Sequence, residues 1–228
     1  MFKKIKIVTA TENSIEEFKK NSILWKCKER LHDIDIIPIT NNKKGLPSVY
    51  NDFINAENKD YIIAFVHDDV EIISNNLIEA LNISPWDITG LAGGKGYTLR
   101  EPYLWHLCCP KEMLSGSVSH PIWSAVDNKI VKSEIEQIPS VYGPWPRRCT
   151  VIDGLFIAVN IEKALERKFK FDEDFNFHFY DISSCLIANQ CNMTIGTYPI
   201  SVLHQGLGDS AMSDNWKMEC SKFIKKWV

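Results

Sequence analysis

The N-terminal third of the chain alternates between short apolar runs and stretches with helical spacing. The apolar runs predict strands at 4–9, 34–39 and 61–66. The last run, Y-I-I-A-F-V, is apolar at every position, which is typical of a strand buried on both faces. A capping-box pattern at Ser14 predicts a helix to about Arg30, and the apolar spacing predicts a second helix at 46–54. Strands that alternate with helices indicate βαβ units and a parallel sheet.

The pattern is less regular in the second half of the chain. Further strands are expected at 88–92, 150–153, 155–160 and 198–203, and helices from Ile161, over 180–189 and over 216–227. Between Tyr97 and Trp145 the periodicity is weak, while Trp, Pro and Gly are frequent. We therefore expect a long irregular loop region there, which in a compact domain is usually functional. No repeat or linker divides the chain, so the sequence predicts one α/β domain over 1–228.

Composition narrows the class of protein. The 228 residues suit one large domain, and 45% hydrophobic with 24% charged residues exclude a disordered or fibrous chain. A net charge of −3 gives no basic surface for nonspecific nucleic-acid binding, so no nucleic-acid partner is expected. Neither a signal peptide nor a transmembrane segment is expected, because no apolar run is long enough. The seven cysteines include no C-x-x-C pair, so neither a structural zinc site nor a disulfide scaffold is expected. This pattern of cysteines favours a cytoplasmic location.

The sharpest candidate for chemistry follows the strand at 61–66. His67-Asp68-Asp69 places two adjacent carboxylates at the carboxyl end of a strand, where open α/β sheets bind ligands. A divalent cation offsets the repulsion between such carboxylates, and Mg²⁺ or Mn²⁺ binds their oxygen atoms together with a diphosphate. The same three residues also suit a solvated turn with Asp68 as a cap. The residues alone leave both interpretations open.

Four other places have a functional and a structural interpretation. Asp153-Gly154 ends an apolar segment and is either a carboxylate beside a substrate hydroxyl or a simple turn. Asp181 is either a general base or a carboxylate in the first turn of a helix, and spacing alone favours the helix. His204, followed by Q-G-L-G, is either a ligand beside a close backbone approach or a structural histidine. Trp105 lies in the Trp-rich region, whose rings either stack on sugars or fill the core.

Several motifs occur in the order of a known family. They are S-V-Y-N (48–51), F-V-H-D-D-V (65–70), V-I-D-G (151–154), F-D-E-D-F (171–175) and F-H-F-Y-D (177–181), with His204 after them. Together with the βαβαβ start, they resemble the family-2-like glycosyltransferases of the GT-A fold, in particular short members with an H-D-D version of the D-x-D motif. The resemblance covers nearly the whole chain. It implies a single Rossmann-like domain with a mostly parallel central sheet flanked by helices, with a nucleotide-binding half at 1–96 and an acceptor-binding and catalytic half at 97–228.

The resemblance also implies roles for individual residues. Asp69 matches the second Asp of D-x-D, the metal ligand at the donor diphosphate, and His204 matches a late residue that completes the metal shell. Asp181 matches the catalytic base. The residues implied at the nucleotide sugar are Thr9, Ala10, Thr11, Asn51, His67 and Asp68. Asp153 and Gly154 are implied near the donor sugar or the acceptor, and Trp105, from the Trp-rich region, is assigned to the same place as an expectation.

The implied reaction is an inverting transfer from a nucleotide-diphosphate sugar, with UDP favoured, to a hydroxyl of a glycan or lipid-linked acceptor. The implied cofactor is Mn²⁺ or Mg²⁺ on the diphosphate. One alternative is a nucleotidyltransferase, which usually has a Gly-rich basic loop after the first strand, where this chain has A-T-E-N. Another is a non-catalytic module that binds nucleotide sugars or glycans.

The C-terminal segment has a basic face at Lys222, Lys225 and Lys226. This face is either a peripheral membrane contact or, as favoured, a solvated helix face.

Overall fold

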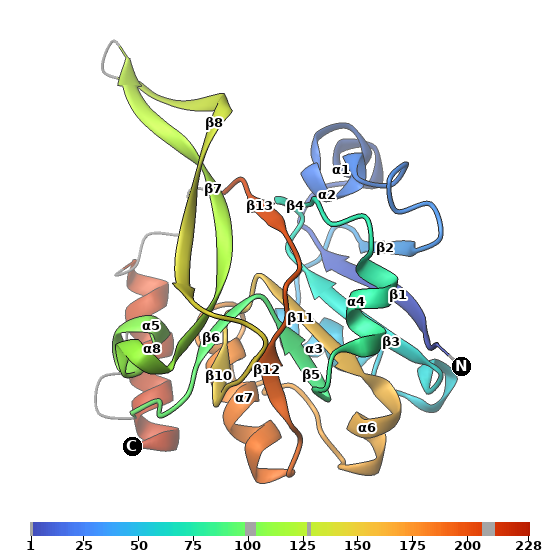
Figure 1. The fold of residues 1–228 in the computed structure, drawn as a ribbon, viewed down its shortest axis with the longest axis vertical. Helices are drawn as coiled ribbons and strands as arrows, with labels where there is room; N and C mark the ends of the chain where they lie inside the picture. The colour runs from blue at the N-terminus through green and yellow to red at the C-terminus, as the bar shows by residue number, and fades with distance from the viewer. Residues whose placement is uncertain (1, 99–103, 127–128, 207–212) are drawn as a thin grey trace.

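The computed structural model of the chain describes residues 2–98, 104–126, 129–206 and 213–228. At its centre is a seven-stranded sheet in the order β2-β1-β3-β11-β5-β12-β9, with helices packed around it (Figure 1). The strands are β2 (Asp35–Ile39), β1 (Lys4–Ala10), β3 (Tyr61–Val66), β11 (Phe156–Asn160), β5 (Ile88–Gly90), β12 (Ile195–Thr197) and β9 (Arg147–Arg148).

Five of these seven strands run in the same direction. β1 pairs in parallel with both β2 and β3, and β5 pairs in parallel with β12. β11 lies between β3 and β5 and is antiparallel to both, and β9 is antiparallel to β12. The prediction of an α/β fold with a mostly parallel central sheet is confirmed. Because β11, β12 and β9 come from the second half of the chain, both halves build this one sheet.

A second sheet has the order β10-β6-β7-β13-β4, with β8 paired to β7. Its strands are β10 (Val151–Ile152), β6 (Ala92–Gly94), β7 (Leu114–Val126), β13 (Val202–His204), β4 (Val70–Ile72) and β8 (Lys129–Gly143). The single strand predicted at 88–92 is wrong, because the chain leaves the central sheet after Gly90 and enters the second sheet at Ala92. The strand predicted at 198–203 is likewise replaced by β12 and β13, which belong to different sheets.

The irregular region predicted between Tyr97 and Trp145 is wrong for most of its described length. β7 and β8 form a long antiparallel hairpin that projects from the body of the molecule at the top of Figure 1. Its register shifts between Gly116 and Ser117 and again between Pro121 and Trp123. Bulges and a proline interrupt the alternation that marks a strand in sequence, which is why the pattern was misleading. α5 (Trp105–Cys108) and η2 (Lys111–Met113) precede the hairpin.

Side-chain caps mark the start of several helices. Oγ of Ser14 accepts a hydrogen bond from the amide of Glu17, whose carboxylate accepts one in return, so the predicted capping box is present. The helix predicted to Arg30 is interrupted at Ser22, which ends α1 (Ile15–Asn21) and caps α2 (Ile23–Lys26). The other helices are α3 (Leu46–Asn51), η1 (Ala56–Asn58), α4 (Leu77–Ile83), α6 (Ile161–Glu166), α7 (Tyr180–Gln190) and α8 (Asp214–Trp227).

β3 lies within the hydrophobic core. This strand is buried from Ile62 to Val66, as its apolar run predicts. Tyr50 of α3 stacks on Phe65 with 4.4 Å between the ring centroids, and Phe171 meets both rings edge-on. Each such ring contributes roughly 1.5–3 kcal/mol by its burial. The packing fixes α3 and the 171–175 segment around the end of the strand that delivers His67.

Candidate active site

The H-D-D loop leaves β3 at the edge where the parallel strands end. The amide of His67 donates a hydrogen bond to the carbonyl of Leu155 at 3.1 Å. The carbonyl of Asp68 accepts hydrogen bonds from Oγ of Ser22 at 2.8 Å and from the amide of Leu24 at 3.2 Å. The start of α2 therefore holds the loop, and Ser22 serves both the helix and the loop.

His204 lies beside Asp69, although most of the chain separates the two residues in sequence. β13 pairs with β4 so that His204 is opposite Val70, and the amide of Gln205 donates to the carbonyl of Asp69 at 2.9 Å. Nε2 of His204 is then 3.3 Å from Oδ2 of Asp69. Together with His67 they form a His-Asp-His cluster, whose ligand atoms all lie within 4.8 Å of one another. One carboxylate and two imidazoles suit a divalent transition-metal ion.

The electrostatics of the His-Asp-His cluster fit a cation. Oδ1 of Asp69 is buried, and no hydrogen-bond donor reaches it within the described residues. Burial alone would raise the pKa of Asp69, but the hydrogen bond and charge of His204 outweigh it and lower that pKa. Burial acts to lower the pKa of His204, but the hydrogen bond and charge of Asp69 outweigh it and raise that pKa. Burial lowers the pKa of His67, which favours the neutral imidazole that binds metal ions.

Two aromatic residues connect His67 to its surroundings. Phe177 stacks on the imidazole with 5.8 Å between the ring centroids. The hydroxyl of Tyr180 lies 3.5 Å from Nε2 of His67 and donates a hydrogen bond to the carbonyl of Gly154 at 2.7 Å. Tyr180 therefore links the H-D-D loop to the D-G turn, and it directly precedes Asp181.

The D-G turn brings Asp153 into the same region. Nε1 of Trp105 donates to Oδ2 of Asp153 at 2.9 Å, and the amide of Leu155 donates to Oδ1 at 3.1 Å. Trp105 is only 5% exposed, so its indole orients this carboxylate and has little free face for a sugar ring. Tyr142 and His106, both half-buried, lie 4.8 and 5.5 Å from the Trp105 ring centroid. These two rings provide the more accessible aromatic surface here.

Asp181 lies in the first turn of α7, against the D-G turn. Its Oδ1 accepts a hydrogen bond from the amide of Ile182 at 2.8 Å. A Cβ placed on Gly154 would lie 3.1 Å from Cβ of Asp181, so the backbone of the turn approaches α7 closely. Burial and, after it, the negative charge of Asp153 raise the pKa of Asp181 to about 7. A carboxyl group with this pKa exchanges a proton near neutral pH, as a general base requires.

A pocket of about 510 Å³, here called the β1 pocket, adjoins the His-Asp-His cluster. It is lined by Ala10, Thr11, Glu12, Asn42, Lys43, Lys44, Gly45, Leu46, Asn176 and Phe177. Phe177 belongs both to this pocket and to the stack on His67. Thr9 is fully buried within β1 and does not line the pocket.

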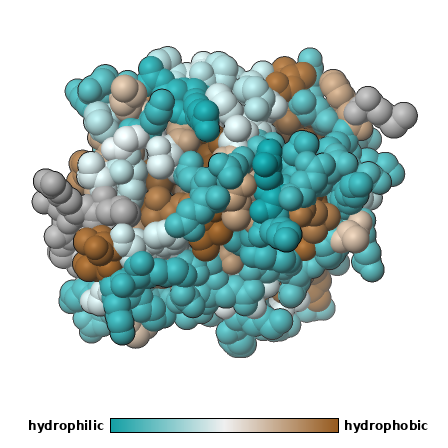
Figure 2. Space-filling model, turned by 90° about the horizontal axis from the view of Figure 1, so that it is seen from below, coloured by the Kyte–Doolittle hydropathy of each residue, from teal (hydrophilic) through white to brown (hydrophobic). Residues whose placement is uncertain are grey.

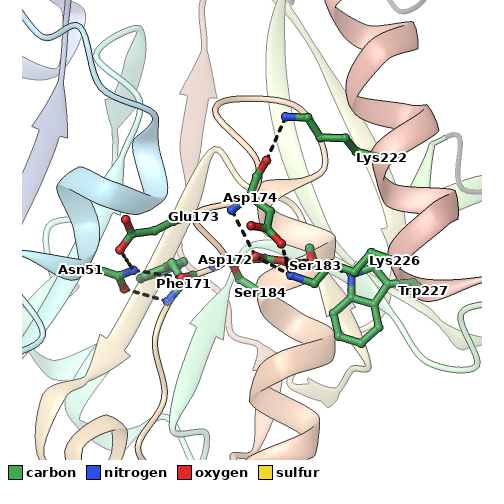
Figure 3. A network of polar contacts seen from close by, with 10 residues as sticks. All are labelled: Asn51, Phe171, Asp172, Glu173, Asp174, Ser183, Ser184, Lys222, Lys226 and Trp227. Carbon is green, nitrogen blue, oxygen red and sulfur yellow. Dashed lines mark hydrogen bonds and ion pairs between the residues drawn. The ribbon is translucent and has the colours of Figure 1, made fainter.

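The structure places Asn51 elsewhere. Its Nδ2 donates to the carbonyl of Phe171 and to the carboxylate of Glu173, and its Oδ1 accepts from the amide of Phe171 (Figure 3). These bonds occupy the side chain and direct it to the 171–173 segment, away from the β1 pocket. Asn51 therefore ties α3 to the F-D-E-D-F segment, and its implied contact with a nucleotide stays a prediction.

Among the residues of the β1 pocket that sequence reasoning did not assign, three bear on ligand binding: Lys43, Lys44 and Phe177. Lys43 and Lys44 bring positive charge to the pocket, and their only signal in sequence is a polar loop after the strand at 34–39. Phe177 lies inside the F-H-F-Y-D motif, but the motif does not tell which of its rings meets His67. Two lysines in the loop after a strand next to the first strand indicate a site for phosphate.

The lysines of α8 are largely engaged with the protein (Figure 3). Nζ of Lys226 forms ion pairs with Asp172 at 2.8 Å and with Asp174 at 2.7 Å, and Lys222 donates to the carbonyl of Asp174 at 3.0 Å. Figure 2 shows the face seen from below as mainly hydrophilic, with hydrophobic residues in separate patches. These contacts favour a structural role for the lysines. In the part of the chain that the structure describes, no helix is long and apolar enough for a bilayer.

Comparisons with known proteins give the family and the fold. The sequence model of the glycosyltransferase-like family matches residues 28–227. The catalytic domain of Drosophila β1,4-galactosyltransferase 7, solved with xylobiose, is similar at 11% identity and a TM-score of 0.50, over 85% of this chain and 63% of that chain. GalNAc-T7, solved with UDP, GalNAc and Mn²⁺, is similar at 11% identity and a TM-score of 0.52, over 99% of this chain and 48% of that chain. No curated protein matches the sequence.

Both solved structures are glycosyltransferases, and this chain spans 63% and 48% of their lengths. At such low identity the likeness concerns the fold, and it confirms the predicted GT-A fold. The family match is independent of the structures and extends over most of the sequence. It agrees with the predicted class of enzyme. The chain therefore belongs to the glycosyltransferase-like family.

Proposed function

We propose that the protein is an inverting glycosyltransferase that moves a sugar from a nucleotide-diphosphate sugar to a hydroxyl of a glycan or lipid-linked acceptor. One observation carries the proposal. The His-Asp-His cluster adjoins the β1 pocket through Phe177 and adjoins Asp181 through Tyr180. A donor whose nucleotide fills the pocket would have its diphosphate at the cluster and its sugar near Asp181.

The β1 pocket offers the groups that a nucleotide needs. Ala10 and Thr11 lie at the end of β1, and Lys43 and Lys44 supply positive charge for phosphate oxygens. UDP and Mn²⁺ occur together in the similar GalNAc-T7 structure, which supports UDP as the nucleotide. Since Phe177 also lines the pocket, the nucleotide site would draw on both the 1–96 half and the 97–228 half.

The His-Asp-His cluster would hold the divalent cation. Asp69 would supply carboxylate oxygen, including the Oδ1 to which no described residue donates, and His67 and His204 would supply ring nitrogens. With a cation held by these residues, the negative charge that grows on the departing diphosphate would be neutralised. Two imidazole ligands favour Mn²⁺ over Mg²⁺, which prefers oxygen ligands. Asp68, in the same loop, is assigned to the nucleotide sugar.

Asp181 would act as the general base. It would accept the proton of the acceptor hydroxyl while that oxygen bonds to the anomeric carbon and the nucleotide diphosphate leaves from the opposite face. A single displacement inverts the configuration and needs no covalent enzyme intermediate. Asp153, oriented by Trp105, helps to keep the pKa of Asp181 near neutral and lies where the sugar or acceptor would enter. Tyr142 of β8 is the accessible ring against which an acceptor sugar would stack.

We place this reaction in the cytoplasm, with polysaccharide biosynthesis as its setting. The seven cysteines all lie within the described residues and form no disulfide there, and six of them are buried. Cysteines without disulfides are typical of a reducing compartment. Detection of the native protein in the cytosolic fraction would support this location, and detection outside the cell would contradict it.

The experiment that tests the function is thermal unfolding with UDP, GDP, CDP and dTDP, each with and without Mn²⁺. A ligand at 100 times its Kd stabilises a protein by about 2.7 kcal/mol, a readily measured shift. A Mn²⁺-dependent shift with one nucleotide, followed by acceptor-dependent consumption of the corresponding sugar nucleotide, supports the proposal. Formation of a sugar nucleotide from a nucleoside triphosphate would indicate a nucleotidyltransferase instead. Binding with no turnover across a broad acceptor panel would indicate a non-catalytic module.

A further inference from the structure

The loop at 176–179 serves two parts of the site. Its first two residues line the β1 pocket, and Phe177 stacks on His67. The loop also ends where α7 begins, one residue before Tyr180 and two before Asp181. A displacement of the loop would therefore move the pocket wall and the proposed base together.

One buried carboxylate from the C-terminal helix holds this loop. Glu219 of α8 is 0% exposed. Its Oε1 accepts a hydrogen bond from the amide of Asn176 at 2.7 Å. Its Oε2 accepts from the amide of His178 at 2.7 Å and from that of Phe177 at 3.4 Å. Hydrogen bonds from amides to a carboxylate are shorter and stronger than those between neutral groups, so three successive amides are fixed by one side chain.

The same helix fixes the far end of the loop. Phe179 has a φ of 60°, in the left-handed region that bulky residues rarely adopt. Its ring packs against two rings of α8, Trp216 at 5.2 Å and Phe223 at 5.3 Å between centroids. A strained backbone of this kind persists only where its surroundings hold it. α8 therefore supports the loop at both ends.

The other side of the loop is pressed against the wall of the β1 pocket. The amide of Leu46 donates to the carbonyl of Asn176 at 2.8 Å. A Cβ on Gly45 would lie 2.8 Å from Cα of Asn176, so only glycine leaves room for this approach. The loop is thus clamped between α8 and the start of α3, with little freedom to move away from either.

We propose that Glu219 is a positioning residue: through the amides of 176–178 it sets both the Phe177 wall of the nucleotide site and the start of the helix that carries Asp181. This inference rests on the proposed function, because it concerns the same site. If Glu219 merely fastened α8 to the body, its loss would lower stability alone. Positioning requires that its loss also weakens nucleotide binding and turnover, beyond any effect of stability.

The test compares Glu219→Gln with two control variants on α8. Glu219→Gln keeps the size of the side chain but replaces one acceptor oxygen by an NH₂ group, which faces a backbone amide that can only donate. Lys226→Met removes the ion pairs to Asp172 and Asp174 and so weakens the docking of α8 without touching the loop (Figure 3). Lys217→Ala changes an exposed side chain of the same helix. If Glu219→Gln does not fold, Glu219→Ala takes its place and is assayed well below its melting temperature.

Three readouts are needed on each variant. Hydrogen exchange of the 176–178 amides reports the contact without any assumption about function. The affinity for UDP with Mn²⁺ and the separate values of kcat and KM report the site. In Glu219→Gln we expect the three amides to exchange faster, the Kd for UDP to rise about tenfold, and kcat to fall. Lys226→Met should lower the melting temperature while leaving the UDP affinity at the wild-type value, and Lys217→Ala should change neither.

Three outcomes would overturn the inference. If Glu219→Gln binds UDP as tightly as the wild type, or loses no more affinity than a Lys226→Met protein of equal melting temperature, Glu219 has only a structural role. Unchanged exchange of the 176–178 amides would show that the loop does not depend on it. If the wild-type protein binds no nucleotide at all, the proposed function itself fails, and the inference fails with it.

Discussion

Nε2 of His204 lies 3.3 Å from Oδ2 of Asp69, and the pairing of β13 with β4 keeps the two residues together. A strand near the end of the chain thereby completes a cluster that the loop after β3 begins. The spacing of the two residues in sequence gives no hint of this contact. The contact between His204 and Asp69 provides a preformed set of oxygen and nitrogen metal ligands at the edge of the sheet.

Replacing either residue should abolish the effect of the metal on nucleotide binding. In Asp69→Asn and in His204→Ala we expect the UDP-induced thermal shift to become the same with and without Mn²⁺. His32→Ala, at a histidine whose side chain is 75% exposed, is the matched control and should behave as the wild type. In the wild type, Mn²⁺ should support a larger shift than Mg²⁺ at equal concentration. A full Mn²⁺-dependent shift in both variants would contradict this assignment.

Gly206 is a second, steric test of the same cluster. A Cβ at this position would overlap the Asp69 carboxylate and would come within 3.3 Å of Nε2 of His204. Gly206→Ala should therefore weaken Mn²⁺ binding by displacing ligands that remain chemically intact. Ser201→Ala, at an exposed position close before β13, is the control. Titration with Mn²⁺, followed by isothermal calorimetry, measures the effect, and equal affinity in both variants would refute it.

The pKa of Asp181 predicts the pH dependence of turnover. Because the base must be unprotonated and its pKa is raised to about 7, kcat/KM should fall about tenfold per pH unit below that value. The assay needs saturating Mn²⁺ at each pH, so that protonation of the histidines does not add to the effect. An acid limb near the ordinary carboxyl value of 3.8 would show that Asp181 is not the group that titrates.

The same raised pKa predicts that Asp181 costs stability. Between an unfolded pKa of 3.8 and a folded pKa of about 7 the native state binds more protons, so wild-type stability is lost as pH rises through this window. Asp181→Asn removes this cost. Its free energy of unfolding should exceed that of the wild type by about 2 kcal/mol at pH 8, after allowance for solvent screening. The difference should vanish near pH 4, and urea unfolding at both pH values measures it.

The sequence predicts an element well when the apolar pattern of that element alone shows which of its faces are buried. The apolar run at 61–66 predicts β3 because both faces of that strand are covered by the protein. The β7–β8 hairpin was missed because bulges shift the register of β7, while residues of β8 such as Ile138 and Val141 are 57% and 67% exposed. A strand without a buried face shows no alternation in sequence.

The site was predictable only in part, and mainly through resemblance. Spacing alone favours a structural role for Asp181, as a carboxylate in the first turn of a helix. No local pattern in the sequence joins His204 to Asp69. The nucleotide contact of Asn51 is implied only by its neighbours in the family motif and stays a prediction, since the structure shows its side chain bonded to Phe171. One feature of the sequence points to Glu219. It is a charged residue on the helix face that also carries Trp216 and Phe223, and a buried charge on such a face needs hydrogen-bond partners.

The most direct test of the whole account is Asp181→Asn, with UDP binding and turnover measured on the same preparation. The account predicts that the Kd for UDP with Mn²⁺ is unchanged, because Asp181 does not line the β1 pocket. Turnover should fall by about a hundredfold to ten-thousandfold, the usual contribution of a general base. Wild-type turnover in this variant would contradict the role of Asp181 and, with it, the proposed mechanism.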